Sequence, residues 1–225
     1  MTTTLSPARS GAGSRPGNAR GPLAAGAEVR LALPSYRAGE RPKGDAVPAL
    51  AVLGRSNVGK SSLLNALLGT KVARVSQTPG RTQALYWYRV GERFDVVDCP
   101  GYGYAKTGRE KRKSFEGLIE NLLLGSADGA PAAAALLLID GRLAAQESDV
   151  SMSRFLRESS VPTVVAATKW DAVKPSQRVR QLRSLSAAFA DSDRPLLPVS
   201  AETGENLPEL ARLLRAALSS PSPKE

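Results

Sequence analysis

Gly54-Arg55-Ser56-Asn57-Val58-Gly59-Lys60-Ser61 is the stretch that decides how this chain of 225 residues folds. It follows an apolar run at residues 49–53 and precedes a helical pattern at residues 62–68. This order of strand, glycine-rich loop and helix is typical of a phosphate-binding loop, in which successive backbone N–H groups and the helix N-terminus face an anion. The pattern predicts that Lys60 reaches the outer phosphates and that the Ser61 hydroxyl holds Mg²⁺. The simpler alternative is a glycine turn that opens an ordinary helix.

Composition excludes several kinds of chemistry. The chain has one cysteine, Cys99, and no histidine, so an internal disulfide and histidine-based acid–base or metal chemistry are excluded. A single cysteine favours a reducing compartment, and no apolar run approaches the roughly 18 residues of a membrane span. The N-terminus also lacks the apolar segment of a signal peptide. We therefore expect a cytoplasmic protein that does not act at a membrane.

The net charge of +10 is unevenly distributed. Residues 1–46 carry 7 basic and 3 acidic side chains, residues 47–115 carry 12 and 4, and residues 116–225 carry 12 and 14. The positive excess thus lies in the N-terminal tail and in the part that contains the phosphate-binding loop. Such asymmetry favours a polyanionic partner such as a nucleic acid, against the alternative of a solvated basic surface.

Apolar patterns alternate between strand and helix along the chain. After a strand-like segment at residues 29–36, runs typical of strands cover residues 49–53, 84–90, 94–97, 134–139, 163–167 and 196–199. Helical spacing follows the phosphate-binding loop and recurs at residues 115–123, 150–156, 179–189 and 207–218. This alternation predicts an α/β fold, with a mostly parallel six-stranded sheet, one antiparallel strand from the hairpin at Gly91-Glu92, and helices on both faces.

Three regions follow from the composition along the chain. Residues 1–27 are mostly Gly, Ala, Pro, Ser, Thr and Arg, which predicts a disordered basic tail. The alternating pattern predicts a single domain over residues 28–218. The remaining residues, 219–225, are predicted to form a short flexible tail. No dimerisation segment is evident, so we expect a monomer.

Further motifs lie in the loops that follow the predicted strands. Asp98-Cys99-Pro100-Gly101 follows one strand; Asp98 there can hold Mg²⁺ through water, and the Gly101 N–H can sense a γ-phosphate. Thr82, in the loop after the first helix, can reach Mg²⁺ when a γ-phosphate is present. Because ligands bind at the carboxyl ends of parallel strands, these loops are expected at one edge of the sheet.

Two other strand ends carry the signature of guanine recognition. Thr168-Lys169-Trp170-Asp171 ends one strand, and the Asp171 carboxylate can accept both N–H groups of the guanine N1/N2 edge, which adenine lacks. The Lys169 stem can cover the face of the base, and Ser200-Ala201 can support guanine O6 through a backbone N–H. Each motif alone is weak, but together and in order they predict a GTP-binding domain.

These motifs resemble those of translation-factor-class P-loop GTPases with a Ras-like domain. More narrowly, residues 54–65, 78–83 and 98–106 resemble the EngB (YihA/YsxC) family of bacterial ribosome-biogenesis GTPases. The resemblance covers about residues 29–218 and implies GTP hydrolysis with Mg²⁺, association with the large ribosomal subunit and its rRNA during assembly, and a requirement in cell division and septation. The chain departs from the family pattern at Leu143, where the family commonly has histidine, and at the bulky Trp170.

Carried onto the matching positions, the resemblance gives a full set of expected contacts. Nucleotide contacts are expected at Gly54, Arg55, Ser56, Asn57, Val58, Gly59, Lys60, Ser61, Gly80, Arg81, Thr82, Gln83, Ala84, Asp98, Cys99, Pro100, Gly101, Thr168, Lys169, Trp170, Asp171, Val199, Ser200 and Ala201. The expected Mg²⁺ ligands are Ser61 and Thr82, and the expected catalytic residues are Lys60, Thr82 and Asn57.

The residue after the Asp98 motif predicts slow hydrolysis. Signalling GTPases place a glutamine there to orient the attacking water, but this chain has Tyr102, which cannot act as an amide does. Two hypotheses supply the missing group. Either K⁺ binds at Asn57 and adds positive charge in the transition state, or the ribosome supplies the group in trans. The alternative for Asn57 is an ordinary turn residue.

A basic cluster follows the same motif: Lys106, Arg109, Lys111, Arg112 and Lys113. Charges on a segment that reorders when γ-phosphate is lost would couple the nucleotide state to rRNA phosphate contacts. A solvated helix start is the alternative, although cations oppose the dipole there. Three other functions are alternatives: a regulatory GTPase acting on a protein effector, a metabolic P-loop kinase, and an RNA-binding module with a vestigial nucleotide site. The missing lipidation signals and the guanine motif argue against the first two.

Overall fold

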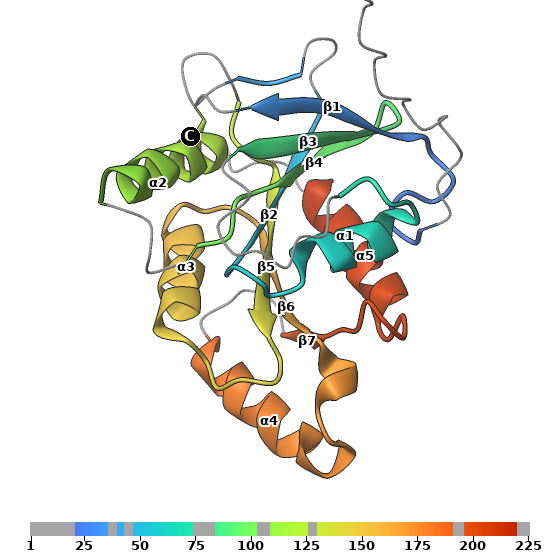
Figure 1. The fold of residues 1–225 in the computed structure, drawn as a ribbon, viewed down its shortest axis with the longest axis vertical. Helices are drawn as coiled ribbons and strands as arrows, with labels where there is room; N and C mark the ends of the chain where they lie inside the picture. The colour runs from blue at the N-terminus through green and yellow to red at the C-terminus, as the bar shows by residue number, and fades with distance from the viewer. Residues whose placement is uncertain are drawn as a thin grey trace, which may run out of the picture.

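The computed structural model describes residues 21–35, 40–42, 47–73, 84–102, 109–125, 130–190 and 196–219. Within them the chain forms one seven-stranded sheet with helices on both sides (Figure 1). The strands are β1 (Val29–Ser35), β2 (Ala49–Gly54), β3 (Leu85–Val90), β4 (Phe94–Asp98), β5 (Ala134–Asp140), β6 (Thr163–Thr168) and β7 (Leu197–Pro198). The helices are α1 (Lys60–Leu68), α2 (Arg109–Leu124), α3 (Glu147–Glu158), α4 (Pro175–Ala188), α5 (Leu207–Leu218) and the short 3₁₀ turn η1 (Trp170–Ala172).

The sheet has the predicted α/β character, with one strand more than expected. Its order is β1-β3-β4-β2-β5-β6-β7. Strand β3 pairs antiparallel with both β1 and β4, while β2, β4, β5, β6 and β7 pair in parallel. Only β3 therefore runs against the rest, as the hairpin predicted. The expected count of six strands was wrong because the strand-like segment predicted at residues 29–36 pairs with β3 and joins the sheet as β1.

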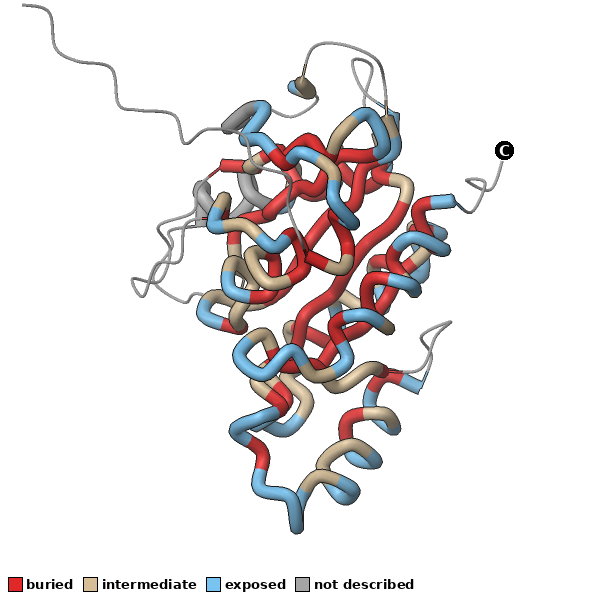
Figure 2. Tube along the Cα trace, turned by 90° about the vertical axis from the view of Figure 1, so that its right-hand side faces the viewer, coloured by how far each residue is buried: buried red, intermediate tan, exposed pale blue. Residues whose placement is uncertain are grey.

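The central strands are buried on both faces, which explains their uninterrupted apolar sequences. Alternate residues of β2 point in opposite directions: Leu50 and Val52 belong to the core under α1 and α5, whereas Ala51 and Leu53 belong to the core under α2, α3 and α4. Figure 2 shows this buried layer running through the middle of the molecule, with exposed positions on the outer sides of the helices. The two cores fix the central strands, and thus the loops at their carboxyl ends.

The ends of α1 follow from its flanking glycines. Gly59, at the N-cap, has φ 101° and Gly69, at the C-cap, has φ 69°, both in the region that favours glycine. The Gly69 N–H donates to the Asn65 carbonyl at 2.8 Å and closes the last turn. The helix therefore starts at Lys60, two residues before the helical pattern in the sequence, and the lysine that is predicted to bind phosphate is its first residue.

Part of the segment that composition assigns to the tail packs on the domain. Leu23 and Ala24 are fully buried in the core under α1 and α5. The Leu23 N–H donates to the Leu67 carbonyl at 2.9 Å, and the Arg215 guanidinium donates to the Pro22 carbonyl at 2.6 Å. Residues 21–27 thus belong with the folded domain in this structure. None of the helices within the described ranges is long and apolar enough to cross a membrane.

Candidate functional site

The loop between β2 and α1 has the backbone of a tight anion-binding turn. Asn57 (φ 63°) and Gly59 (φ 101°) both have left-handed conformations, and the Val58 N–H donates to the Arg55 carbonyl at 3.2 Å. Gly54 packs so closely that a Cβ would lie 2.8 Å from a Val58 methyl group and 2.9 Å from the Leu138 carbonyl oxygen. The loop is thus held against β5 at its start and passes directly into the first turn of α1.

Lys60 and Asp98 place two opposite charges below this loop. The Lys60 ammonium lies 3.4 Å from the Gly54 carbonyl oxygen, a long contact, and burial lowers the Lys60 pKa despite the nearby Asp98. Burial likewise raises the pKa of Asp98 to about 6, although the charge of Lys60 opposes the shift. Burial thus outweighs the attraction between these two charges in both pKa shifts, which fits a site completed by phosphates and a cation.

The residues at this point fit Mg²⁺. One carboxylate oxygen of Asp98, Oδ1, is buried and has no hydrogen-bond partner among the described residues. A buried charged oxygen without a partner costs free energy, and Mg²⁺ prefers oxygen ligands and retains several waters. Ser61 provides a hydroxyl in the first turn of α1. Asp98, through water, and Ser61 would hold the ion, which would neutralise phosphate charge next to Lys60.

The Asp98–Gly101 loop packs directly on the phosphate-binding loop. A Cβ on Gly101 would lie 2.7 Å from both the N and Cα atoms of Ser56, so only glycine fits there. The Ser56 hydroxyl donates to the Gly101 carbonyl at 3.3 Å, and the Ser56 N–H donates to the Tyr102 carbonyl at 3.1 Å. Cys99 is fully buried, and burial raises its thiol pKa. Cys99 thus packs as a small residue in the core under α2, α3 and α4.

The side chain of Tyr102 reaches α3. Its hydroxyl donates to Oδ1 of Asp149, a buried residue of α3, at 2.9 Å. Burial raises the pKa of the Tyr102 hydroxyl, and Asp149 raises it further. Burial also raises the pKa of Asp149, against the Tyr102 hydrogen bond and the charge of Arg55. Asp149 was not predicted, and an acid within an amphipathic helix gives no signal that would find it.

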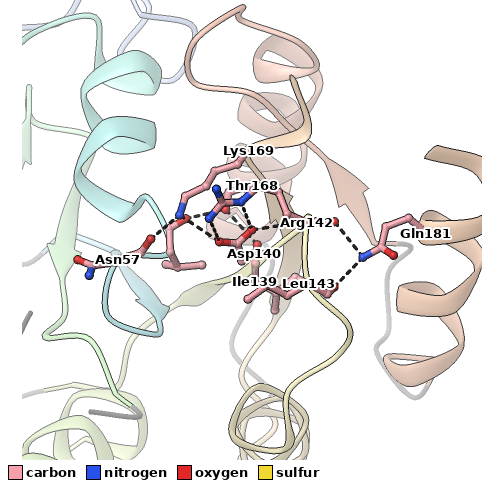
Figure 3. A network of polar contacts seen from close by, with 10 residues as sticks. Asn57, Ile139, Asp140, Arg142, Leu143, Thr168, Lys169 and Gln181 are labelled. Carbon is pink, nitrogen blue, oxygen red and sulfur yellow. Dashed lines mark hydrogen bonds and ion pairs between the residues drawn. The ribbon is translucent and has the colours of Figure 1, made fainter. Parts of the chain in front are cut away.

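The guanine motif contacts the phosphate-binding loop through two consecutive residues. The Thr168 hydroxyl donates to the Val58 carbonyl at 2.6 Å and also lies 3.0 Å from the Ile139 carbonyl oxygen. The Lys169 ammonium donates to the Asn57 carbonyl at 2.5 Å (Figure 3). These contacts join segments 110 and 112 residues apart in the chain. The structure thus brings the predicted base-binding and phosphate-binding residues together.

Asp140, at the end of β5, joins the same group and was missed as a site residue. Its Oδ2 accepts from the Lys169 ammonium at 3.0 Å, and the Arg142 guanidinium donates to both carboxylate oxygens at 2.9 and 2.8 Å (Figure 3). The only signal in the sequence was the Asp-x-Arg spacing that follows the strand. We call Asn57, Asp140, Arg142 and Lys169 the Lys169 network.

Asp171 is exposed and is held in place by a buried serine. The hydroxyl of Ser200, which is fully buried, donates to Asp171 Oδ1 at 2.6 Å and accepts from the N–H groups of Glu202 and Thr203 at 3.2 and 3.1 Å. Trp170, which lies between Lys169 and Asp171 in the sequence, is buried in the core beside α4. The bulky tryptophan therefore packs inward, while the neighbouring carboxylate remains available to a base.

Part of the predicted site lies outside the described residues. This holds for Gly80, Arg81, Thr82 and Gln83, and for Lys106; Ala84, the next residue, is described and fully buried. The basic positions Arg109, Lys111, Arg112 and Lys113 fall in the first turns of α2, and their side chains are outside the description.

Comparison with known proteins identifies the family. Residues 49–169 match a family model described as "50S ribosome-binding GTPase". The chain is 38% identical over 183 residues to a "Probable GTP-binding protein EngB" of Thermotoga maritima, covering 79% of this chain and 92% of that protein. A protein of the same name from Gemmatimonas aurantiaca is 41% identical over 176 residues, covering 78% and 85%. The chain belongs to the EngB family of GTP-binding proteins.

Solved structures agree with this assignment. A crystal structure of a probable EngB protein has a TM-score of 0.62 at 28% identity, covering 76% of this chain and 98% of that one. Era of Aquifex aeolicus, bound to GDP and AlF₄⁻, also has a TM-score of 0.62, at 26% identity, with 79% and 58% covered. The predicted EngB resemblance and Ras-like GTPase fold are therefore confirmed. Membership makes this chain a P-loop protein that binds guanine nucleotides and supports its assignment as a GTP hydrolase.

Proposed function

We propose that this EngB-family protein hydrolyses GTP as a switch in the assembly of the large ribosomal subunit. The observation that carries the proposal is the joined site: Thr168 and Lys169 bind the carbonyls of the loop that presents Lys60. Base recognition and phosphate binding are thus built into one unit. The description of the matching family, a 50S ribosome-binding GTPase, supports the subunit as partner. A role in normal cell division and septation would follow from this assembly step in a cytoplasmic monomer.

Each predicted group has a defined part in this function. Lys60 neutralises charge on the outer phosphates, Ser61 and Thr82 hold Mg²⁺, and Asp98 orients a water on the ion. The Gly101 N–H senses the γ-phosphate. Because the Tyr102 hydroxyl is bound to Asp149, it does not orient the attacking water, which supports slow intrinsic hydrolysis. The missing positive charge comes from K⁺ at Asn57 or from the ribosome.

Turnover in K⁺ and in Na⁺ separates the two sources of that charge. Asn57 has a left-handed backbone, and its carbonyl accepts a hydrogen bond from the Lys169 ammonium, so this residue is held in one conformation. If K⁺ activates, GTP turnover of the isolated protein is faster in K⁺ than in Na⁺ at equal ionic strength. Equal rates that rise on addition of large subunits would assign the activation to the ribosome.

Sedimentation through a sucrose gradient tests the ribosomal role. The protein is loaded with large subunits in a non-hydrolysable GTP analogue or in GDP, and co-migration is measured at low and high salt. We expect co-migration with the analogue that weakens in GDP and at high salt, because phosphate contacts release counterions. No association in either nucleotide would contradict the proposal and point to a protein effector.

The basic start of α2 is tested in the same assay. Changing Lys111, Arg112 and Lys113 together to glutamine should weaken co-migration and reduce its salt dependence. A matched control changes three exposed arginines on α3 and α4, Arg154, Arg180 and Arg183, to glutamine. If both triple variants bind equally well, the start of α2 is not the rRNA contact.

A further inference from the structure

The Lys169 network connects Asn57 of the phosphate-binding loop with Lys169 of the guanine motif (Figure 3). We propose that Asp140 is a positioning residue of the nucleotide site. Its carboxylate holds the Lys169 ammonium against the Asn57 carbonyl. This contact fixes the position of the Lys169 side chain, which would lie along the base, and the position of the loop that would surround the phosphates. The inference rests on guanine nucleotide binding and not on the ribosomal role.

Lys169 requires such support because of its own conformation. It has φ 56°, a left-handed backbone that costs a non-glycine residue free energy and persists only where surrounding contacts hold it. Its side chain has four rotatable bonds, and fixing it costs conformational entropy. Two acceptors at 2.5 and 3.0 Å hold the ammonium, one from the phosphate-binding loop and one from Asp140. Without Asp140, one contact would have to fix the whole side chain.

Asp140 is itself well fixed and charged. Its side chain is only 12% exposed, and the Arg142 guanidinium and backbone N–H both donate to it, the latter at 3.1 Å. Burial raises the pKa of Asp140, but the hydrogen bonds from Arg142 and Lys169 outweigh burial and hold the pKa below its ordinary value. The carboxylate is therefore ionised at neutral pH and, being largely buried, acts on Lys169 with little screening.

A purely structural role for Asp140 makes a different prediction. In that role, the ion pair of Arg142 with Asp140 would serve only to close the turn after β5. Gln181 of α4 also holds this turn, because its side-chain amide donates to the Gly141 and Leu143 carbonyls at 3.0 and 2.6 Å (Figure 3). In that case the effect of losing Asp140 would not depend on Lys169. In our proposal the effect passes through Lys169 and disappears when that residue has lost its charge.

A double-mutant cycle decides between the two. The affinity of a fluorescent GDP analogue is measured for wild type, Asp140→Asn, Lys169→Gln and the double variant. We expect D140N to weaken binding about tenfold and K169Q to weaken it more, while D140N changes the K169Q protein by less than about twofold. The proposal is overturned if D140N binds like wild type, or if it weakens both backgrounds by the same factor.

Two controls complete the experiment. Glu209→Gln makes the same chemical change in an exposed ion pair with Arg212 on α5, and should leave GDP affinity unchanged. Arg142→Gln removes the other partner of Asp140 and should cost less affinity than D140N; an equal or larger loss would show that the carboxylate acts through the turn. Thermal unfolding confirms that each variant folds. Because the isolated protein is used, failure to bind ribosomes would not affect the result.

Discussion

The two halves of the proposed nucleotide site, one for the base and one for the phosphates, differ in how well their polar groups are paired. In the base half, Thr168, Lys169, Asp171 and Ser200 each have a hydrogen-bond partner at 2.5 or 2.6 Å. In the phosphate half, the one hydrogen bond that Lys60 makes to a described residue is long, at 3.4 Å. Three buried side-chain nitrogen or oxygen atoms lack a partner in the described part of the chain, and two of them, Asp98 Oδ1 and Arg55 Nε, belong to this half.

This difference shows which half the protein completes by itself. The base half is organised by hydrogen bonds that exist before any nucleotide arrives, so binding there needs little rearrangement. The phosphate half holds desolvated charges whose missing partners a nucleotide and Mg²⁺ would supply. The unliganded protein is thus stabilised by one half of its site and destabilised by the other.

Lys60→Ala should have the largest effect on nucleotide binding. It removes the lysine in the first turn of α1 that is expected to bind the outer phosphates. Losing charge-assisted hydrogen bonds to two phosphates costs roughly 4 kcal/mol, about a thousandfold in GDP affinity. Lys71→Ala, an exposed lysine just beyond α1, is the matched control and should bind normally. A K60A protein that binds GDP within tenfold of wild type would contradict the assignment of the phosphate half.

Asp171→Asn should change which base is preferred. The carboxylate accepts two hydrogen bonds from guanine, and their loss costs roughly 3 kcal/mol, about a hundredfold in affinity. An asparagine amide can instead donate to the O2 of xanthine while its oxygen accepts from N1–H. Competition between GDP and xanthosine diphosphate measures the switch, and an unchanged preference would remove Asp171 from the base site.

Ser200→Ala should have a smaller effect, mainly on stability. The hydroxyl bonds Asp171 and two backbone N–H groups, so its loss should lower the free energy of unfolding by roughly 1 to 2 kcal/mol and weaken GTP binding only several-fold. Ser184→Ala on the exposed side of α4 is the control and should be neutral. If both variants unfold like wild type, the base half is not organised by Ser200.

The sequence predicts most of the proposed nucleotide site because the signals of that site are local. The spacing from Gly54 to Ser61 specifies a loop and a helix start within eight residues, and Asp98, Thr168 and Ser200 each follow a recognisable apolar strand. Their convergence follows from parallel topology, since the carboxyl ends of such strands meet at one edge. The structure confirms that Thr168 and Lys169 contact the phosphate-binding loop.

The residues that sequence analysis missed depend on tertiary contacts. Asp140 and Lys169 meet across 29 residues and Tyr102 and Asp149 across 47, with no pattern that pairs them. Residues 21–27 have the small, turn-rich composition of a tail, yet Leu23 fills a space beside Leu67 in the core. Val179, which helps mark the helical pattern of α4, is 65% exposed. Composition and periodicity describe a segment but not what it packs against.

The free energy of unfolding of nucleotide-free Asp98→Asn protein, measured across pH, tests most directly whether the phosphate half destabilises the unliganded protein. Burial raises the Asp98 pKa from 3.8 to about 6, so the wild-type protein loses stability as pH rises from about 4 through 6. Two pKa units correspond to at most about 3 kcal/mol. We predict that D98N is more stable than wild type above pH 7, that the difference vanishes below pH 4, and that Mg²⁺ with GDP stabilises wild type more than D98N. A D98N protein that is less stable than wild type at pH 7.5, or a difference that is independent of pH, would contradict the account.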